Sequence, residues 1–200
     1  MDPRRKTPSV TDPFIQFRKW FSEARESGEN EPEAMSLATA DENGRPSVRM
    51  VFFRDFSPEG FCFFTNYDSR KAIQIGKNPY AALLFYWQRI SRQVRIEGKI
   101  KKVSLGISDQ YFNSRPAGSR ISACISPQSA VIPDRLFLEA MHDAFSKDLG
   151  DKEPQRPSNW GGYILIPDRF EFWTGRDNRL HDRVQFRKVK DRWIAERLAP

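Results

Sequence analysis

The sequence predicts an α+β fold, mainly β, in which a central barrel carries peripheral helices. Three observations support this prediction. The chain has 200 residues, which corresponds to about one domain. Short runs rich in β-branched and aromatic residues alternate with turn residues, a pattern typical of antiparallel hairpins that close into a barrel. Only a few segments carry apolar residues at helical spacing. We therefore expect one domain over residues 12–200, preceded by a flexible, basic arm over residues 1–11.

The first predicted element is a helix at Pro13–Glu26. Asp12 is a typical N-cap residue, and proline is favoured at the helical position that follows it. Phe14, Phe17 and Phe21 recur at helical spacing, which predicts one apolar face. The segment is therefore expected to be an amphipathic helix.

Strand patterns follow from residue 35 to residue 103. Turn signals at 41–44 and 57–60 separate the first of them. A short helix, Arg70–Lys77, is expected after the possible cap at Asp68 and Ser69. The predicted strands are 35–40, 48–54, 61–65, 81–87 and 94–103. Apolar residues on both faces of 48–54 predict that this strand is well buried.

The C-terminal half is predicted to mix helices and strands. Helices are expected at 104–113 and at 134–149, with a loop-rich passage over 117–132 between them. Residues 151–159 contain two prolines and are expected to be a connector. Four short strands are then predicted at 162–166, 170–174, 184–189 and 193–197.

Composition and charge exclude several classes of protein. Two cysteines, Cys62 and Cys124, are too few for a disulfide framework or a zinc cluster. No apolar run is long enough to cross a membrane, and no secretory signal is visible, so a cytoplasmic location is expected. The 33 Lys and Arg residues exceed the 26 Asp and Glu residues by seven, which favours an anionic partner. Nucleic acid, an acidic membrane and small phosphorylated molecules all remain possible on this evidence.

Two constellations in the N-terminal half could bind an anion. Arg70 and Lys71 stand at the start of a predicted helix, where unpaired N–H groups and two cations would both favour one. A solvated basic face is the alternative. Arg49 and Arg54 lie in the strand predicted to be buried, but their opposite parity points them to opposite sides. If both serve one site, a bulge or a strand end must intervene.

Two more constellations lie in the C-terminal half. One consists of ordinary phosphate-binding donors around a predicted helix end: Tyr111, Arg115 and Ser119. In the other, Arg179, His181 and Arg183 share one face if their segment is extended. Such clustered positive groups are costly unless an anion lies against them. Phosphate loops, dinucleotide-binding glycine motifs, nucleophile elbows and metal-ligand spacings are missing from the sequence, so an enzyme of this sequence would depend on a bound cofactor.

Nine short segments carry a further signal: RMV (49–51), FTNYDSRK (64–71), RQVRIEG (92–98), YFNSRP (111–116), SPQS (126–129), WGG (160–162), EFW (171–173), RLHDR (179–183) and RLAP (197–200). Taken together and in this order, they resemble the pyridoxamine 5′-phosphate oxidase family, FMN enzymes of vitamin B6 metabolism. The resemblance extends from about residue 13 to the C-terminus. The resemblance implies an FMN-binding split β-barrel that forms a homodimer with two FMN sites at the subunit interface.

The resemblance also implies a role for each site residue. Those expected to bind FMN, largely at its phosphate, are Arg49, Arg70, Lys71, Gln128 and Ser129. Those expected beside the flavin or elsewhere along FMN are Met50, Val51, Phe52, Arg54, Phe64, Thr65 and Gln93, with Trp173 and Arg183 from the second subunit. Those expected at the substrate are Tyr111, Arg115, Ser119 and Arg54 for its phosphate and Arg179, Leu180 and His181 for its ring. Arg179 and His181 are the implied catalytic residues.

The implied reaction oxidises pyridoxamine 5′-phosphate and pyridoxine 5′-phosphate to pyridoxal 5′-phosphate. A hydride passes from the C4′ carbon to FMN, and O2 then takes the electrons and forms H2O2. The sequence departs from the family at Arg54, where lysine is usual, and at Arg120, Ser122 and Thr174. The alternatives are a related split-barrel flavin oxidase with another reduced ring as substrate, a nucleic-acid-binding barrel, and an inactive scaffold. We expect no nucleic acid or membrane partner, because the basic residues are scattered among the acidic ones.

Overall fold

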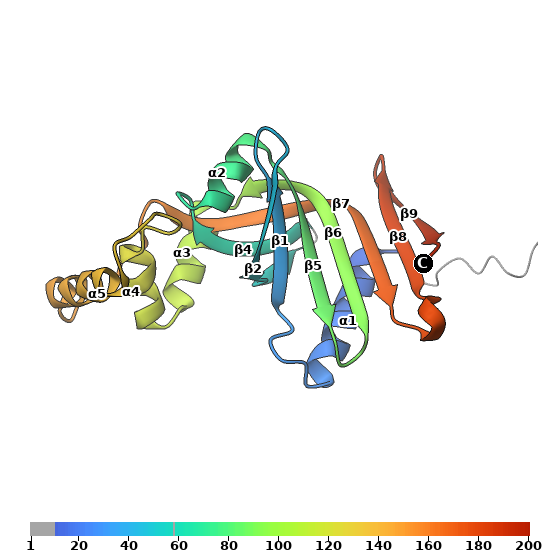
Figure 1. Cartoon of the computed structure of the whole chain (residues 1–200), viewed down its shortest axis with the longest axis horizontal. Coiled ribbons are helices and arrows are strands. Elements are labelled where there is room, and N and C mark those ends of the chain that lie inside the picture. The colour runs from blue at the N-terminus through green and yellow to red at the C-terminus, as the bar shows by residue number, and fades with distance from the viewer. Residues whose placement is uncertain (1–10, 58) are drawn as a thin grey trace, which may run out of the picture.

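In the computed structural model, which describes residues 11–57 and 59–200, antiparallel strands pair into one nine-stranded sheet (Figure 1). The strands are β1 (Ala34–Ala40), β2 (Pro46–Phe52), β3 (Asp55–Ser57), β4 (Gly60–Asn66), β5 (Tyr80–Trp87), β6 (Arg92–Lys102), β7 (Trp160–Thr174), β8 (Asp182–Val189) and β9 (Arg192–Leu198). Their order is β2-β1-β5-β6-β7-β4-β3, and β8 pairs with both β7 and β9. Because β2 and β3 are consecutive in the chain yet stand at opposite ends of this order, the sheet curls back on itself.

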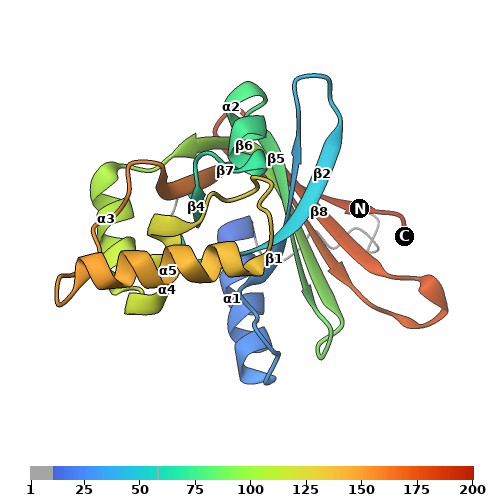
Figure 2. The ribbon, with the colours of Figure 1, turned by 60° about the vertical axis from the view of Figure 1, so that its left-hand side comes forward.

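Five α-helices accompany the sheet in the described residues: α1 (Pro13–Glu26), α2 (Arg70–Lys77), α3 (Leu105–Ser114), α4 (Ala117–Ile125) and α5 (Arg135–Leu149). Figures 1 and 2 both place α3, α4 and α5 together at one end of the molecule, with β8 and β9 at the other. No helix among the described residues is long and apolar enough to span a bilayer. The arm predicted over residues 1–11 falls outside the described residues except for residue 11.

Helix α1 supplies part of the core. The Asp12 side chain accepts a hydrogen bond from the backbone N–H of Phe14 at 2.8 Å, so the predicted N-cap is confirmed. Phe17 is fully buried, and its ring lies 4.8 Å from the ring of Phe61 and 5.1 Å from that of Phe85. Burying one phenylalanine in this way stabilises a fold by about 1.5–3 kcal/mol. The core therefore lies between α1 and the concave side of the curled sheet.

Three expectations about local structure are wrong. The passage at 117–132 was expected to be a loop, but it begins with α4, a helix without a buried residue. Its N-cap is Pro116, a residue that the sequence prediction took as the start of a loop. The strands expected at 162–166 and 170–174 are one strand, β7, because a register shift at Gly98 of β6 accommodates Pro167. The third error is an omission: the three-residue strand β3 was not predicted, because so short a segment shows no alternating pattern.

The strand predicted at 48–54 is not buried within this chain. It is β2, which ends at Phe52 and pairs only with β1, since it lies at an edge of the sheet. Val48 and Met50 are 68% and 62% exposed. Apolar residues on both faces predicted that the strand is buried. The sequence pattern does not say whether the residues that bury it come from this chain or from another. Arg54 lies beyond the end of β2. The opposite parity of Arg49 and Arg54 predicted a bulge or a strand end between them if both serve one site, and the strand end is there.

Candidate active site

The ends of β2 and β4 and helices α3 and α4 border a cavity of about 700 Å³, the central cleft. Its volume is within the usual range of small-molecule sites. Most of the predicted site residues line it, namely Arg49, Met50, Val51, Phe52, Arg54, Phe64, Thr65, Lys71, Tyr111, Arg115, Ser119 and Gln128. Residues far apart in the sequence are therefore brought to one place.

One wall of the central cleft is a stack of aromatic rings. The ring of Phe64 on β4 lies 3.9 Å from that of Tyr111 on α3, with 23° between their planes. On β7, the ring of Trp160 lies 5.7 Å from the Phe64 ring and 16° from its plane. The sequence prediction did not assign Trp160 to the site, although the WGG motif contains it. This wall gives one side of the central cleft an aromatic lining.

Arg115 lies against this wall with an unsatisfied donor. Its guanidinium carbon is 4.8 Å from the centre of the Trp160 ring. The Nη1 atom is buried and has no hydrogen-bond partner among the described residues. Burial lowers the pKa of Arg115, and the charge of Arg54 lowers it further. A buried guanidinium N–H without a partner is costly, so this position is suited to an anionic oxygen.

A second positive group in the cleft is Lys71, the second residue of α2. Its Nζ donates to Gln128 Oε1 at 2.9 Å, to Thr65 Oγ1 at 3.1 Å and to Ser69 Oγ at 3.3 Å. All three acceptors are neutral, and no ion pair joins Lys71 to a carboxylate among the described residues. Burial, and then the charge of Arg49, lowers the pKa of Lys71 to about 8.

Arg49 is likewise held by neutral oxygens. Its Nη1 donates to the Leu37 carbonyl at 3.0 Å and to Thr39 Oγ1 at 2.7 Å, and its Nη2 donates to Ser47 Oγ at 2.5 Å. Burial and the charge of Arg70 lower the pKa of Arg49. Positive groups that lie this close without a carboxylate favour the binding of an anion between them.

Two predicted residues border a neighbouring hollow. The Arg70 backbone N–H donates to Ser129 Oγ at 3.2 Å, and both residues line a cavity of about 680 Å³. Gln128 lines this hollow and the central cleft alike. The start of α2 therefore presents Lys71 to the central cleft and Arg70 to the hollow beside it.

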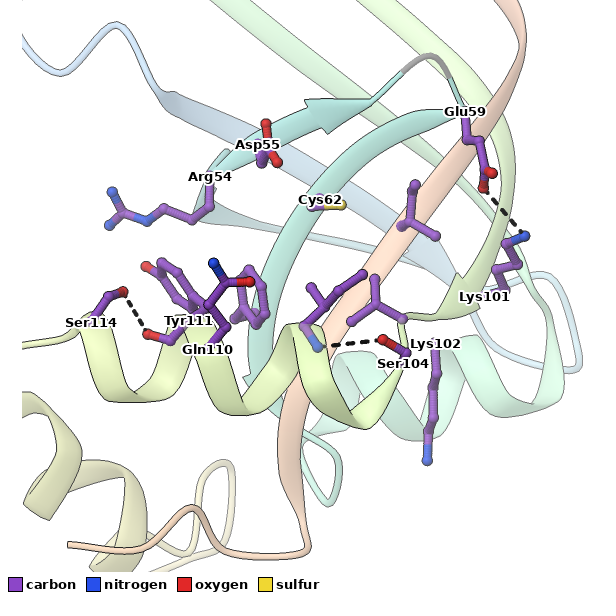
Figure 3. Close-up of a pocket in the computed structure, with 14 residues that line it drawn as sticks. Arg54, Asp55, Glu59, Cys62, Lys101, Lys102, Ser104, Gln110, Tyr111 and Ser114 are labelled. Carbon is purple, nitrogen blue, oxygen red and sulfur yellow. Dashed lines mark hydrogen bonds and ion pairs between the residues drawn. The ribbon is translucent and has the colours of Figure 1, made fainter. Parts of the chain in front are cut away.

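A further cavity of about 700 Å³ adjoins the central cleft, and Arg54, Phe64, Tyr111 and Ser114 line both. Figure 3 shows Tyr111 and Ser114 on α3, with Arg54 extending above that end of the helix. Cys62 also lines this cavity, where burial raises the pKa of its thiol to about 11. The predicted site residues in this cavity are the ones that it shares with the central cleft.

The remaining predicted residues form a second group, the distal group, consisting of Gln93, Trp173, Arg179, Leu180, His181 and Arg183. Gln93 and Arg183 each pair with Trp173 across the sheet. Trp160, in the central cleft, and Trp173 are about 40 Å apart along β7. In Figure 1 this strand runs from the end that carries α3 to the end that carries β8. The distal group therefore does not line the cleft of its own chain.

The distal group is not the row of positive charges that was expected. Asp177–Arg179 form a 3-10 turn, and Arg179 has a φ of 60°, so its segment is not extended. His181 accepts the Arg176 N–H at Nδ1, at 3.1 Å, and its ring lies 4.7 Å from that of Trp173. This compact turn, and not a shared strand face, brings His181 to Trp173.

Arg183 differs from the cleft cations because it is already paired. Its Nε donates to the buried Glu171 carboxylate at 2.8 Å, and its Nη1 donates to the Ala199 carbonyl at 2.8 Å. This pairing raises the pKa of Arg183. Leu180, in the turn, is 70% exposed. The distal group thus presents a tryptophan, a histidine and two arginines at the surface of the chain.

Comparison with known proteins bears on this arrangement. A family model described as "Pyridoxamine 5'-phosphate oxidase" matches residues 21–146, more than half of the chain. The chain belongs to this family. A second model, "Pyridoxine 5'-phosphate oxidase C-terminal dimerisation region", matches residues 160–200 and contains the distal group except Gln93. The predicted resemblance is therefore confirmed.

Curated members of the pyridoxamine 5′-phosphate oxidase family are similar over almost the whole chain. The pyridoxine/pyridoxamine 5′-phosphate oxidase of Herminiimonas arsenicoxydans is 52% identical over 98% of this chain and 92% of its own length. The protein of that name from Pseudomonas syringae pv. syringae is 47% identical over 100% of this chain and 94% of its own length.

Two solved structures share the fold of this chain. PhzG from Burkholderia lata 383, in complex with tetrahydrophenazine-1-carboxylic acid, superposes with a TM-score of 0.90 and 29% identity, over 96% of this chain and 94% of PhzG. An FMN-binding protein related to pyridoxamine 5′-phosphate oxidase, from Nostoc punctiforme, gives a TM-score of 0.76 at 19% identity, over 96% of this chain and 100% of that one. Among the described residues, no cluster of His, Cys, Asp or Glu could hold a metal ion, and both thiols are free.

Proposed function

We propose that this chain is an FMN-dependent oxidase that converts pyridoxamine 5′-phosphate and pyridoxine 5′-phosphate to pyridoxal 5′-phosphate, with O2 as acceptor and H2O2 as second product. The observation that carries the proposal is the pair of positive sites in one aromatic-walled cleft. One is formed by Arg49 and Lys71, whose hydrogen-bond partners among the described residues are all neutral, and the other by Arg115, whose Nη1 has no hydrogen-bond partner there. Two phosphate esters, a cofactor and a substrate, fit this pair.

The residues of the first positive site suit FMN. Arg49, Lys71 and Gln128 would hold its phosphate, with Arg70 and Ser129 beside them. Phe64 and Thr65 would line its ring system, together with the β2 residues that border the cleft. Bound FMN would supply the hydride acceptor for oxidation at C4′ and the route of electrons to O2. The protein's own part is to bind, to orient and to stabilise developing charge.

The second positive site suits the substrate phosphate. Arg115, which lines the cleft, would bind it with its guanidinium, and Tyr111 and Ser119 would add hydroxyl donors from the same side of the cleft. Arg54, which lines the cleft beside the aromatic wall, would add charge. An arginine keeps the charge of the lysine usual in the family at this position but offers a planar fork of donors.

The distal group supports a homodimer in which each site combines two chains. It lies at the far end of β7, so Trp173, Arg179, His181 and Arg183 would reach the cleft of a second copy. The exposed apolar residues Val48 and Met50, on the edge strand, are typical of a surface that another chain covers. In such a dimer, Arg179 and His181 would lie over the pyridine ring and would stabilise charge as the C4′–H bond breaks.

One alternative has an observation of its own. The similarity to PhzG, with a phenazine compound in its structure, favours an oxidase of the same fold that acts on another reduced ring. The unsatisfied Arg115 favours a phosphorylated substrate instead. Turnover of pyridoxine 5′-phosphate should therefore exceed that of unphosphorylated pyridoxine by a large factor, whereas equal turnover of the two would support the alternative.

A direct experiment tests the proposed class. Purified protein should show a flavin absorption spectrum, or should acquire one when FMN is added. Pyridoxine 5′-phosphate should bleach that spectrum without air, and air should restore it while aldehyde accumulates. A protein that stays colourless with FMN and retains RNA in a salt-sensitive manner would support the nucleic-acid-binding reading instead. A flavin spectrum that the substrate does not bleach would contradict the proposed activity.

The lowered pKa of Lys71 predicts a pH dependence of FMN binding. Since its pKa is about 8, Lys71 is mostly charged at pH 7 and mostly neutral at pH 9. The FMN phosphate is fully ionised throughout this range, because its second pKa is about 6. The dissociation constant should therefore rise about tenfold from pH 7 to pH 9. Quenching of flavin fluorescence measures it, and Lys71→Met should bind more weakly with no such rise.

A further inference from the structure

Gln74 lies one turn after Lys71 on α2 and is buried, with 5% exposure. Its side-chain carbonyl reaches from the helix to the two strands β1 and β2. Oε1 accepts hydrogen bonds from Thr39 Oγ1 at 2.6 Å, from Ser47 Oγ at 2.7 Å and, more weakly, from Arg49 Nη2 at 3.5 Å. A single oxygen therefore joins three side chains from two strands.

The directions of these bonds follow from the chemistry of a hydroxyl group, which carries one hydrogen. Thr39 and Ser47 each donate that hydrogen to Gln74, so only their lone pairs remain for other partners. Those lone pairs accept from Arg49, with Nη1 at 2.7 Å from Thr39 and Nη2 at 2.5 Å from Ser47. The Gln74 carbonyl therefore orients both hydroxyls, and through them it sets the position of the Arg49 guanidinium.

The neutrality of Gln74 matters as much as its position. A carboxylate at the same place would form an ion pair with Arg49 and would compete with an incoming phosphate. An amide carbonyl holds the guanidinium without cancelling its charge, as do Thr39, Ser47 and the Leu37 carbonyl. Gln74 also lies on the helix that carries Lys71. It therefore connects Lys71 with Arg49, two of the positively charged residues that line the central cleft.

We propose that Gln74 is a positioning residue for phosphate binding: its carbonyl orients Thr39 and Ser47, which fix the Arg49 guanidinium toward the phosphate of the cofactor. This inference rests on the proposed function, because it takes FMN as the ligand. Gln74 does not line the central cleft, although it borders the neighbouring hollow, so in this proposal it acts on a ligand of the cleft through Arg49.

The test compares FMN with riboflavin, which has the same ring system but no phosphate. Gln74→Met keeps the length and shape of the side chain and removes the acceptor. We expect the dissociation constant of FMN to rise about tenfold, the effect of about one lost hydrogen bond, and that of riboflavin to stay unchanged. Fluorescence quenching gives both constants. A merely structural role would weaken both flavins alike, and that result would overturn the proposal.

A second variant keeps the test decisive if Gln74→Met folds poorly. Ser47→Ala, on the exposed edge strand β2, removes one of the oriented hydroxyls and should also weaken FMN selectively. In the double variant the two losses should not add, because they break one chain of contacts. Full additivity, or an unchanged affinity for FMN in both single variants, would contradict the inference.

The same measurements separate this inference from the proposed function. If the wild-type protein binds FMN no better than riboflavin, the phosphate site itself is wrong. If the wild type prefers FMN and Gln74→Met keeps that preference in full, the proposed function stands and the role of Gln74 is refuted. Gln110→Met is the same substitution at an exposed position of α3 outside the central cleft, and it should leave both constants unchanged.

Discussion

Arg115→Ala is expected to lower kcat/KM for pyridoxine 5′-phosphate by about 10²–10³-fold and to leave FMN bound. A hydrogen bond from a charged group contributes about 1.5–3 kcal/mol, and the guanidinium can offer two to one phosphate. In the absence of the phosphate, the guanidinium contacts the Trp160 ring and its Nη1 has no hydrogen-bond partner among the described residues, so no carboxylate competes with the phosphate for it. Steady-state turnover with phosphorylated and unphosphorylated substrate measures the effect, which should appear only with the first.

Two variants control this experiment. Arg135→Ala removes an arginine that is 89% exposed and pairs with Glu139 along α5, so turnover should not change. Arg115→Lys keeps the charge but loses the planar fork of donors, so its loss should be intermediate. If Arg115→Ala retained wild-type kcat/KM on pyridoxine 5′-phosphate, the assignment of the substrate phosphate to this position would be wrong.

Gly98→Ala is expected to destabilise the fold by about 3 kcal/mol or more, or to prevent folding. Gly98 lies at the register shift of β6, opposite Pro167. A Cβ atom there would stand 2.0 Å from the backbone oxygen of Ile166 and 2.8 Å from Cα of Pro167. These are backbone atoms, so β6 and β7 would have to separate. Urea unfolding followed by fluorescence measures the change in the free energy of unfolding.

Gly76→Ala is the matched control for this substitution. A Cβ atom at Gly76, in α2, would meet nothing within 4 Å. Alanine is favoured over glycine in a helix by up to about 1 kcal/mol, so this variant should be neutral or slightly stabilised. If Gly98→Ala had the same free energy of unfolding as the wild type, β6 and β7 would be able to move apart without loss of stability, and the prediction would be wrong.

Local signals in the sequence predicted local structure well. The bounds of α1 and α2 agree with the prediction, because the signals that start and end a helix lie within a few residues of it. The cap predicted for α2 is wrong, since its N-cap residue, Ser69, makes no side-chain capping hydrogen bond, whereas Asp12 caps α1. The failures have long-range causes. The continuity of β7 depends on a glycine in β6, and the exposure of β2 depends on where that strand falls in the sheet order. Neither is visible in a window of ten residues.

The candidate site shows the same division. Residue spacing predicted several separate anion-binding groups of residues, and only the family resemblance placed them in one site. The structure agrees with the resemblance for Arg49, Lys71 and Arg115, which line the same cleft. Gln74 was missed because its partners come from two strands distant in the sequence. The expected row from Arg179 to Arg183 failed because a left-handed turn replaces the extended backbone. Counting charges could not reveal that Arg183 is paired with Glu171 while the cleft cations have neutral partners.

The length of β7 has a genetic consequence in the proposed dimer. Each chain places its cleft at one end of this strand and its distal group at the other, so each chain belongs to both composite sites. Two chains with different lesions, one in Arg115 and one in Arg179, would pair to leave one site intact. The same two lesions on a single chain, paired with a normal partner, would disable both sites. Complementation between alleles, and dominance of the doubly defective one, would then follow from the geometry of one strand.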